Sequence, residues 1–345
     1  MFGTFISDKS ATFVNQVFII NYMNITIVTT NTIPSIKYGG IERVIWYLAK
    51  ELNKLGHKVT FLAGKGSYCN FANVIELNPL KDINSQIPEN TDFVHLNTPA
   101  DGIQKPHLLT IHGNSIPTNS DQNLVFVSRN HAQRFGSSSF VYNGLDWDDY
   151  QSANLSLPRK NYHFLAKAAW KVKNLKGAMS VAKNIKGGEL EVLGGYRFNF
   201  KMGWRFTFSP RIHFHGMVDD VTKKNIIEQS KGLIFPVTWH EPFGLAITES
   251  LYFGSPVFGT PYGSLPELVS PEVGFLTSNA YKMAEHIQNT EYSPKRCNEY
   301  AREMFNSKIM AEAYLQKYEI VLNGQLLNEE IPHVIDISRH LLWEE

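Results

Sequence analysis

The sequence predicts an α/β protein built from two doubly wound, Rossmann-like domains with parallel sheets. Short apolar segments typical of buried strands alternate with helical segments along most of the chain. A chain of 345 residues is long for one core and suits two domains of about 150 residues each. A polar and irregular stretch at 151–158 separates two such alternating halves. We therefore expect a first domain at 23–155 and a second at 156–306.

The first domain is expected to begin with a buried strand at 23–30, which reads Met-Asn-Ile-Thr-Ile-Val-Thr-Thr. The apolar run that precedes it, Ala11–Tyr22, lacks the basic start and the small-residue cleavage site of a secretory signal. We therefore expect residues 1–22 to be a dispensable N-terminal extension.

Two glycines, Gly39 and Gly40, precede a helix whose apolar residues Val44, Leu48 and Leu52 recur at helical spacing. Glycine lets a ligand approach the backbone closely, and a helix N-terminus favours a phosphate. The alternation that follows favours a parallel sheet. Its expected strands are Lys58–Ala63, Val74–Leu77, Phe93–Leu96, His107–Ile111, Leu124–Val127 and Phe140–Tyr142.

A histidine stands directly after one of these strands. Because open parallel sheets bind ligands at the carboxyl ends of their strands, His112 is a candidate site residue. His95 ends another expected strand and is a second choice.

The second domain repeats the alternation. Two segments, 279–289 and 294–323, have helical patterns, and an acidic tail of unknown use follows at 324–345. The expected strands are Tyr162–Lys167, Glu189–Leu193, Ile212–His215, Leu233–Phe235, Val257–Gly259 and Gly274–Leu276.

The chemistry is concentrated at 232–269, where a buried strand, a polar loop and a helix follow one another. Glu241 stands just before that helix and Glu249 about two turns into it, so both carboxylates are expected on one side. Between them, Phe243, Gly244 and Leu245 place backbone N–H groups at the helix N-terminus, where an anion is favoured. The sequence therefore predicts an acidic, phosphate-binding cleft here.

Composition and charge narrow the function. The net charge of +1 argues against general nucleic-acid binding. However, residues 159–231 hold fifteen Lys and Arg against five Asp and Glu, a local charge of +10. This excess suits an anionic ligand or an anionic membrane surface, or it is a solvated basic face. The two cysteines suggest no disulfide framework and suit the cytoplasm, with the inner face of the membrane as one location there.

These motifs together resemble the nucleotide-sugar site of the retaining GT-B glycosyltransferases of glycosyltransferase family 4. The resemblance implies two Rossmann-like domains facing across a cleft, with the donor bound mostly by the second and the acceptor by the first. It also implies that a terminal helix at 307–323 crosses back to the first domain. The matching residues are Y-G-G-I-E-R at 38–43, T-I-H-G at 110–113, V-S at 127–128, V-Y-N-G-L-D at 141–146, H-E-P-F-G-L at 240–245, Glu249, G-S-P-V at 254–257, Gly263 and P-E at 266–267.

The resemblance also assigns roles. It implies that Glu241 and His112 lie beside the donor sugar and that Glu249 binds the ribose diol. Gly39 and Gly40 would reach the donor phosphates or the acceptor. The donor would also contact the backbone of Phe243, Gly244 and Leu245, and the base would contact the turn that holds Met217 and Val218.

A basic turn after the strand at 162–167 departs from the family pattern. Family members have glycine and arginine there and a lysine five residues on, whereas this chain has Ala166, Lys167 and, one residue later than usual, Lys173. We expect Lys167 and Lys173 to hold the donor diphosphate, with Lys171 and Lys176 as rivals. Lysine is a point charge rather than a bidentate fork, so the grip on the diphosphate differs from that of arginine.

No metal site is expected. Asp146 and Asp148 form a D-x-D, but the first belongs to the V-Y-N-G-L-D segment, so we interpret both as loop residues. His213 and His215 form an H-x-H without a third ligand at matching spacing.

We therefore expect a metal-independent, retaining glycosyltransferase that needs no cofactor and uses a nucleotide-diphosphate sugar. Its acceptor would be a carbohydrate or a glycolipid, in the assembly of a cell-surface polysaccharide or glycoconjugate. Two alternatives stay open, a non-catalytic nucleotide-sugar-binding protein and a nucleotide-sugar epimerase of the same architecture.

Overall fold

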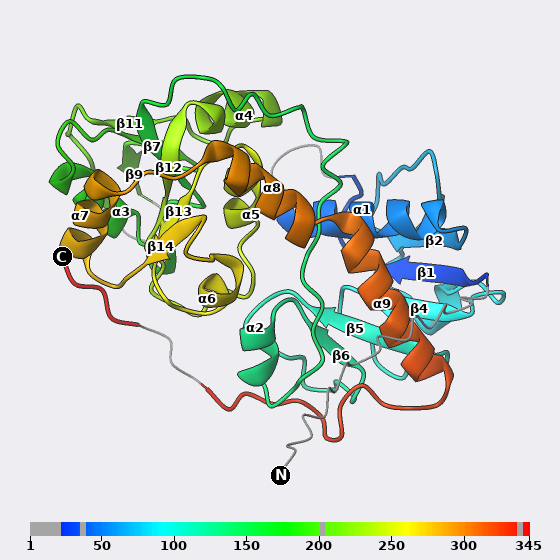
Figure 1. The fold of residues 1–345 in the computed structure, drawn as a ribbon. Coiled ribbons are helices and arrows are strands. Elements are labelled where there is room, and N and C mark those ends of the chain that lie inside the picture. Colours follow the sequence, from blue (N-terminus) through cyan, green and yellow to red (C-terminus); the bar gives the residue numbers. More distant parts are fainter. Residues whose placement is uncertain (1–21, 35–38, 201–203, 337–340) are drawn as a thin grey trace, which may run out of the picture.

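The computed structural model of the protein describes residues 22–34, 39–200, 204–336 and 341–345. In these residues the chain folds into two α/β domains that lie side by side (Figure 1). The extension expected at 1–22 lies outside the described residues except for Tyr22, as does Tyr38 of the Y-G-G-I-E-R motif. No helix in the described ranges is long and apolar enough to cross a membrane.

The first domain contains a six-stranded parallel sheet with the order β3-β2-β1-β4-β5-β6. The order reverses between β1 and β4, as in a doubly wound sheet. The strands are β1 (Asn24–Val28), β2 (Lys58–Ala63), β3 (Asn73–Glu76), β4 (Phe93–Leu96), β5 (His107–Ile111) and β6 (Leu124–Phe126).

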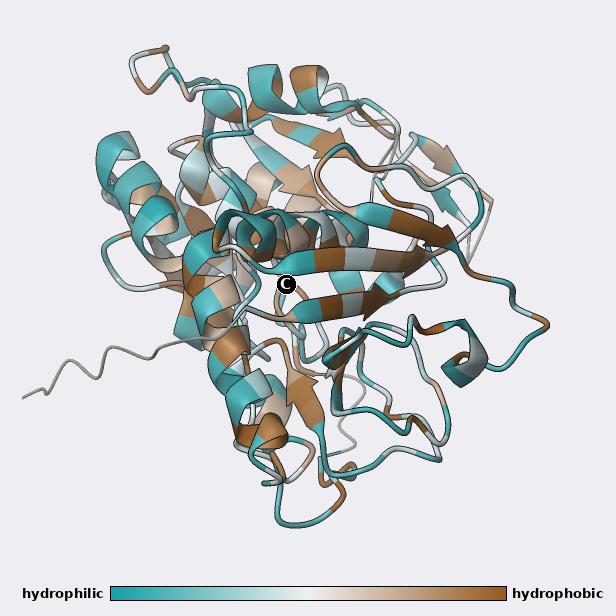
Figure 2. Cartoon of the chain, turned by 90° about the vertical axis from the view of Figure 1, so that its right-hand side faces the viewer, coloured by the Kyte–Doolittle hydropathy of each residue, from teal (hydrophilic) through white to brown (hydrophobic). Residues whose placement is uncertain are grey.

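Alternating side chains of this sheet pack into two separate cores. Ile25 and Ile27 of β1 face helices α1 (Gly40–Lys54) and α9 (Ser307–Leu322), whereas Val28 faces the core on the other side. Helix α2 (Arg129–Gln133) contributes to that second core. In Figure 2 the strands of this domain carry apolar colours along their middles while many connections are hydrophilic. Helix α9 follows the second domain in the chain and packs on the first.

The second domain repeats the same topology, with the sheet order β11-β8-β7-β12-β13-β14 and all pairs parallel. The predicted architecture of two Rossmann-like domains is thus confirmed. The strands are β7 (Asn161–Leu165), β8 (Leu190–Leu193), β11 (Ile212–Phe214), β12 (Ser230–Phe235), β13 (Val257–Gly259) and β14 (Gly274–Leu276). The helices are α3 (Leu175–Asn184), α4 (Asp220–Glu228), α5 (Leu245–Tyr252), α6 (Leu265–Leu268), α7 (Ala280–Asn289) and α8 (Pro294–Met304).

Three details differ from the sequence-based expectation. The segment at 140–142 forms only an isolated bridge to β6. The helical segment at 294–323 is two helices, because Asn306 leaves helical geometry and its side chain caps α9 through the N–H of Ile309. Between β8 and β11, a small antiparallel hairpin of β9 (Phe198–Asn199) and β10 (Arg205–Phe206) stands where a helix would normally cross over.

The acidic tail contacts both domains. Asn328 donates to the carbonyls of Gln122 and Leu124 in the first domain. At the other end, the N–H of Leu341 donates to the carbonyl of Thr238, and Glu344 forms a bridge with Asn279. In Figure 1 the tail runs below α2 and ends beside α7.

A buried histidine connects helix α5 to its sheet by hydrogen bonds. His163 of β7 lies between the hydroxyls of Ser230 on β12, at 2.7 Å, and Ser250 on α5, at 2.8 Å. Burial lowers the pKa of His163 to about 3. Burial also lowers the pKa of three other histidines, namely His95 to about 3, His112 to about 4 and His131 to about 3.

We therefore expect the free energy of unfolding to fall as pH falls from about 6.5 towards 4. The unfolded chain binds protons in this range while the four buried histidines stay neutral, so each group costs up to about 3 kcal/mol at pH 4. Urea unfolding between pH 7 and 4 measures the loss. His163→Gln should flatten the slope, because it removes one of the four buried histidines. A slope equal to that of the unaltered protein would contradict this assignment.

Candidate active site

A cavity of about 460 Å³ lies between the two domains, and residues of both line it. Its walls are built at the carboxyl ends of strands, where doubly wound sheets bind ligands. From the first domain, Gly40 and His112 reach it; from the second come the turn after β7 and the loop after β12. The sequence-predicted residues that line it are Gly40, His112, Lys167, Lys173, Glu241, Phe243, Gly244 and Leu245.

The loop after β12 is held in place by the turn that follows β13. Ser264 donates through its N–H to the carbonyl of Glu241 at 2.9 Å and through its hydroxyl to that of Phe243 at 2.6 Å. Gly263 adopts a φ of +63°, and a Cβ there would stand 2.2 Å from the backbone nitrogen of Glu241. Only glycine permits this approach, so Gly263 fixes the position of Glu241.

The carboxylate of Glu241 is buried and has two partners on the same oxygen. Lys173 Nζ lies 2.5 Å from Glu241 Oε2, and the indole N–H of Trp239 donates to this oxygen at 2.8 Å. The ammonium also lies over the rings of Trp239, at 4.9 Å, and Phe235, at 5.3 Å. The result is a hydrogen-bonded ion pair just before the N-terminus of α5.

Asn174, the residue after Lys173, holds the lysine turn in its conformation. It adopts the left-handed region at φ +52°, which asparagine tolerates better than most residues. Its side-chain oxygen caps α3 through the N–H of Gly177, and its amide donates to the carbonyl of Pro236 at 3.0 Å. Asn174 thus joins the lysine turn to the loop that carries Glu241.

Among the candidate lysines, Lys167 and Lys173 line the cavity, and neither rival does. Lys167 is exposed, with its Nζ 5.3 Å from the ring centre of Trp170. Lys176 instead pairs with Glu345 of the tail at 3.0 Å. Both predicted lysines are therefore within the cavity wall, one of them already paired and the other open to solvent.

The ring of His112 is held by Asn97, whose Oδ1 lies 2.9 Å from His112 Nε2. Since burial lowers its pKa to about 4, the imidazole is neutral at pH 7. His95 plays a different part: it hydrogen-bonds to Tyr318 and Thr110 inside the first domain and does not line the cavity.

Glu249 is not in the cavity wall. Its Oε1 accepts from Lys223 Nζ at 2.5 Å and from the hydroxyl of Tyr150 at 3.0 Å, and all of these groups are largely buried. Lys223 also pairs with Asp220, which Arg43 of the first domain contacts at 2.6 Å. Glu249 therefore ends a chain of charges that begins beside Gly40, so the two glutamates do not share one open surface as the sequence suggested.

Three other predicted residues also stand apart from the cavity. Gly39 is the N-cap of α1, and neither Met217 nor Val218 lines the cavity wall. The side chain of Met217 is exposed. The residue before it, Gly216, packs against the ring of Tyr196.

Sequence reasoning missed the aromatic wall of the cavity and the charges behind it. Trp239 stands directly before the H-E-P-F-G-L motif, so its position alone was a signal. Trp170 lies within the basic turn, where only the lysines gave a signal. Lys223 and Tyr150 carried no signal, because their role arises from contacts with Glu249 between separate elements.

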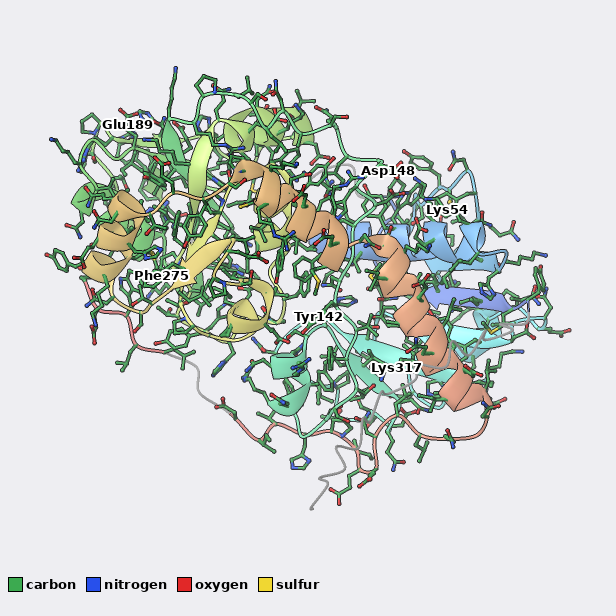
Figure 3. All side chains as sticks on the ribbon, viewed as in Figure 1. Lys54, Tyr142, Asp148, Glu189, Phe275 and Lys317 are labelled. Atoms are coloured by element: carbon green, nitrogen blue, oxygen red, sulfur yellow. The ribbon has the colours of Figure 1, made fainter. Side chains whose placement is uncertain are left out.

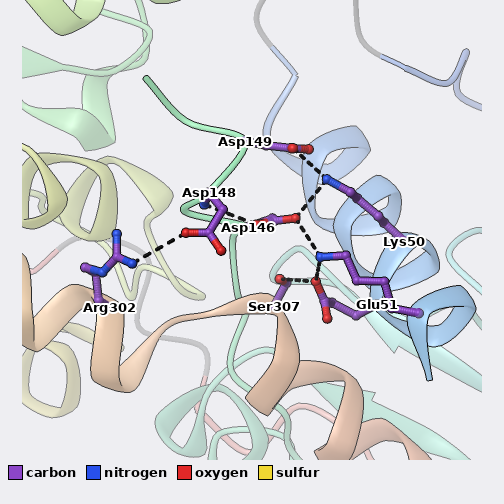
Figure 4. A network of polar contacts seen from close by, with 8 residues as sticks. Lys50, Glu51, Asp146, Asp148, Asp149, Arg302 and Ser307 are labelled. Carbon is purple, nitrogen blue, oxygen red and sulfur yellow. Dashed lines mark hydrogen bonds and ion pairs between the residues drawn. The ribbon is translucent and has the colours of Figure 1, made fainter. Parts of the chain in front are cut away.

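The D-x-D aspartates are engaged in ion pairs. Asp146 contacts Lys50 at 2.9 Å and Lys54 at 3.2 Å, while Asp148 faces Arg302 at 3.5 Å (Figure 4). Within the described residues, no group of three or more His, Cys, Asp or Glu could hold a metal ion. His213 and His215 pair instead with Glu189 and Glu191 of the neighbouring strand segment.

A second polar junction joins the domains beside the cavity. Glu267, of the P-E pair, accepts hydrogen bonds from the N–H groups of Arg129 and Asn130 at the start of α2. It also accepts from the hydroxyl of Tyr142 at 2.7 Å, a residue that lies where the domains meet (Figure 3). The carboxylate thus compensates the exposed amides of a helix in the other domain.

Comparisons with known proteins relate this chain to glycosyl transferases in sequence and in fold. Residues 154–304 match the family model of group 1 glycosyl transferases. A segment of 104 residues is 26% identical to trehalose synthase from Pyrococcus horikoshii and spans 29% of this chain but only 25% of that enzyme.

The similar solved structures include two glycosyltransferases and a protein in complex with UDP-glucose. AviGT4, involved in avilamycin A biosynthesis, aligns with a TM-score of 0.74 at 19% identity and covers 88% of this chain and 98% of its own. A glycosyltransferase from Rickettsia africae gives 0.68 at 19% identity, with coverage of 88% and 100%. Anabaena HepE in complex with UDP-glucose gives 0.62 at 15% identity, with the same coverage. The resemblance to GT-B glycosyltransferases is thus confirmed, by sequence in the second domain and by fold over both.

Asn174 offers a test of how the lysine turn is held. Asn174→Ala should destabilise the protein by about 2 kcal/mol, because it removes an N-cap and strains a left-handed residue. Asn174→Gly loses the same hydrogen bonds but tolerates the backbone, so it should cost distinctly less. Urea unfolding measures both, and equal losses would contradict the role given to backbone strain.

Proposed function

We propose that this chain is a glycosyltransferase that transfers a sugar from a nucleotide-diphosphate sugar to a hydroxyl acceptor, with retention of configuration and without a metal ion. One observation supports the proposal most directly: two lysines, the N-terminus of α5 and a buried carboxylate that pairs with one of these lysines line one cavity between two Rossmann-like domains. The family match over 154–304 supports nucleotide-sugar chemistry at this place.

The departing nucleoside diphosphate gains negative charge in the transition state, and the cavity offers groups of the opposite sign. Lys167 and Lys173 provide two ammonium groups, while the N–H groups at Gly244 and Leu245 supply the positive end of α5. Each well-placed donor of this kind contributes about 3 kcal/mol to lowering a barrier. These cations can perform the part that a divalent ion performs elsewhere.

The anomeric carbon becomes cationic as the diphosphate leaves, and Glu241 can stabilise that charge. Its contacts to Lys173 and Trp239 fix the carboxylate in position, which suits electrostatic stabilisation better than covalent attack. We therefore favour same-face displacement. Neutral His112 would orient a hydroxyl of the donor sugar by a hydrogen bond.

Glu249 is proposed to act on the nucleotide. Its Oε1 is engaged by Lys223 and Tyr150, so binding of the ribose diol would use the other oxygen and a small rearrangement of this network. The donor is proposed to be a hexose carried by a nucleoside diphosphate, consistent with the UDP-glucose complex of HepE. The acceptor is proposed to be a carbohydrate or glycolipid in cytoplasmic glycoconjugate assembly.

A second candidate is a non-catalytic nucleotide-sugar-binding protein, favoured by lysine at 167 in place of the family's arginine. Incubation with a panel of nucleotide sugars distinguishes the two. Neither transfer nor slow hydrolysis would support the binding protein. Product NMR would detect an epimerase as an altered sugar still attached to its nucleotide.

The two glutamates should separate kinetically. Glu249→Gln should weaken nucleotide affinity, read as a smaller thermal shift with UDP, GDP or ADP, whereas Glu241→Gln should chiefly lower kcat by about 100-fold. Glu285→Gln on the exposed face of α7 is a matched control and should change neither. The reverse pattern for the two glutamates would overturn their assigned roles.

Charge at the lysine turn gives a further test. Lys167→Gln and Lys173→Gln should each lower kcat/KM by about 100-fold, and Lys171→Gln, outside the cavity wall, should have little effect. A chelator should leave the rate of the unaltered protein unchanged. Loss of activity on chelation would refute the metal-free mechanism.

A further inference from the structure

The hairpin between β8 and β11 exposes its apolar side chains and buries its polar ones. Side chains alternate along a strand, so one face of a hairpin on a protein surface is normally apolar and buried. Here Thr207 is buried at 6% exposure and Arg205 is half-buried, while the apolar side chains point outward. Five rings form this outer face and are between 47% and 80% exposed: Phe198, Phe200, Trp204, Phe206 and Phe208. We call these five residues the aromatic face.

The aromatic face is one continuous patch. The ring centres of Phe198 and Phe206 are 6.0 Å apart, those of Phe198 and Phe208 5.9 Å, and those of Trp204 and Phe206 6.5 Å. Single exposed rings are common on protein surfaces, but five adjoining ones mark an interaction site. The hairpin belongs to the second domain, and its strand β9 lies on the side of that domain away from α1 and α9 (Figure 1).

The polar side of the hairpin anchors it firmly to the domain. Arg197 donates to the carbonyls of Thr207, Ser209 and Ile212, and Arg205 donates to those of Ala168 and Tyr196. The rings are therefore displayed on a fixed support. Arg205 also connects the hairpin to the residue that follows Lys167 of the cavity wall.

Charge around the aromatic face selects the partner. Residues 192–218 contain no Asp or Glu, and Arg197, Arg205 and Arg211 make no ion pair in the part of the chain that the structure describes. Arg197 and Arg205 lie on the polar side of the hairpin, where they donate to backbone carbonyls, and the stretch as a whole carries positive charge with no acidic residue. A patch of Trp and Phe with basic neighbours fits the interface of an anionic bilayer, where rings insert at the headgroup level and cations attract the lipids.

The ring geometry disfavours a flat ligand. Neighbouring rings are inclined to each other by 49° to 90°, so they offer no common plane on which sugars or bases could stack. Phenylalanine also supplies no hydrogen-bonding group for sugar hydroxyls.

We propose that the aromatic face docks the protein on an anionic lipid membrane. The proposal gives part of the basic excess at 159–231 a function, because some of these basic residues lie near the docking surface. Docking would place the outer side of the second domain against the bilayer. The proposal does not depend on the transferase activity, and lipid binding alone tests it.

Vesicle flotation tests it directly. The unaltered protein should float with phosphatidylcholine vesicles that contain about 30 mol% phosphatidylglycerol, more weakly with phosphatidylcholine alone, and less as salt is raised. Trp204→Ser combined with Phe208→Ser should reduce binding by about tenfold or more. Both side chains are largely exposed, so melting temperature and nucleotide-induced thermal shift should stay unchanged.

Two further variants make the test specific. Tyr68→Ser with Tyr281→Ser removes exposed rings elsewhere and should bind vesicles normally. Trp204→Phe should bind vesicles as strongly as the unaltered protein. Its tryptophan emission should shift less to the blue when vesicles are added, because Trp204 no longer contributes. Equal binding by the Trp204→Ser, Phe208→Ser variant and the unaltered protein would overturn the proposal. The proposal would also be overturned if the unaltered protein bound no vesicles and instead formed a dimer that the same double substitution dissociates.

Discussion

The ion pair between Glu241 and Lys173 is the contact on which the rest of the site depends. A buried carboxylate is costly unless it is paired and hydrogen-bonded, and here Lys173 and Trp239 supply both compensations. The pair exists because β7 and β12 are neighbours at the point where the order of the sheet reverses. The turn after one and the loop after the other must then meet, which is the general location of ligand sites in such sheets.

The two domains are coupled to this site by charges that cross between them. Arg43 reaches Asp220, which leads through Lys223 to Glu249, and Glu267 compensates the start of α2. Each of these contacts requires the present spacing of the domains. An anionic donor entering the cavity would therefore compete for cations that now pair with protein carboxylates, so donor binding and domain spacing are linked by the same groups.

The sequence contained enough to predict the architecture and the loop that carries Glu241. Strand positions followed from short apolar runs, and His112, Lys167 and Lys173 were found because motif order and strand ends constrain them locally. Glu249 was different: helical spacing placed it on the side of Glu241, but its contacts with Lys223 and Tyr150 draw it into a buried network. Partners that meet only through tertiary packing leave no periodic signal. The hairpin was also missed, because its alternation runs with the apolar side outward, opposite to the pattern that identifies a buried strand.

The basic excess of residues 159–231 separates by residue type, and this explains why the cavity is lined by lysines. All four arginines of this segment, Arg159, Arg197, Arg205 and Arg211, donate to backbone carbonyls. The planar fork of arginine suits that task, since it satisfies several carbonyls at once where chain segments end or turn. Lysine offers a compact charge on a flexible stem, so it pairs with a single acceptor, as Lys173 does with Glu241. The arginines thus build the frame of the second domain, and the cations of the cavity wall are the lysines Lys167 and Lys173.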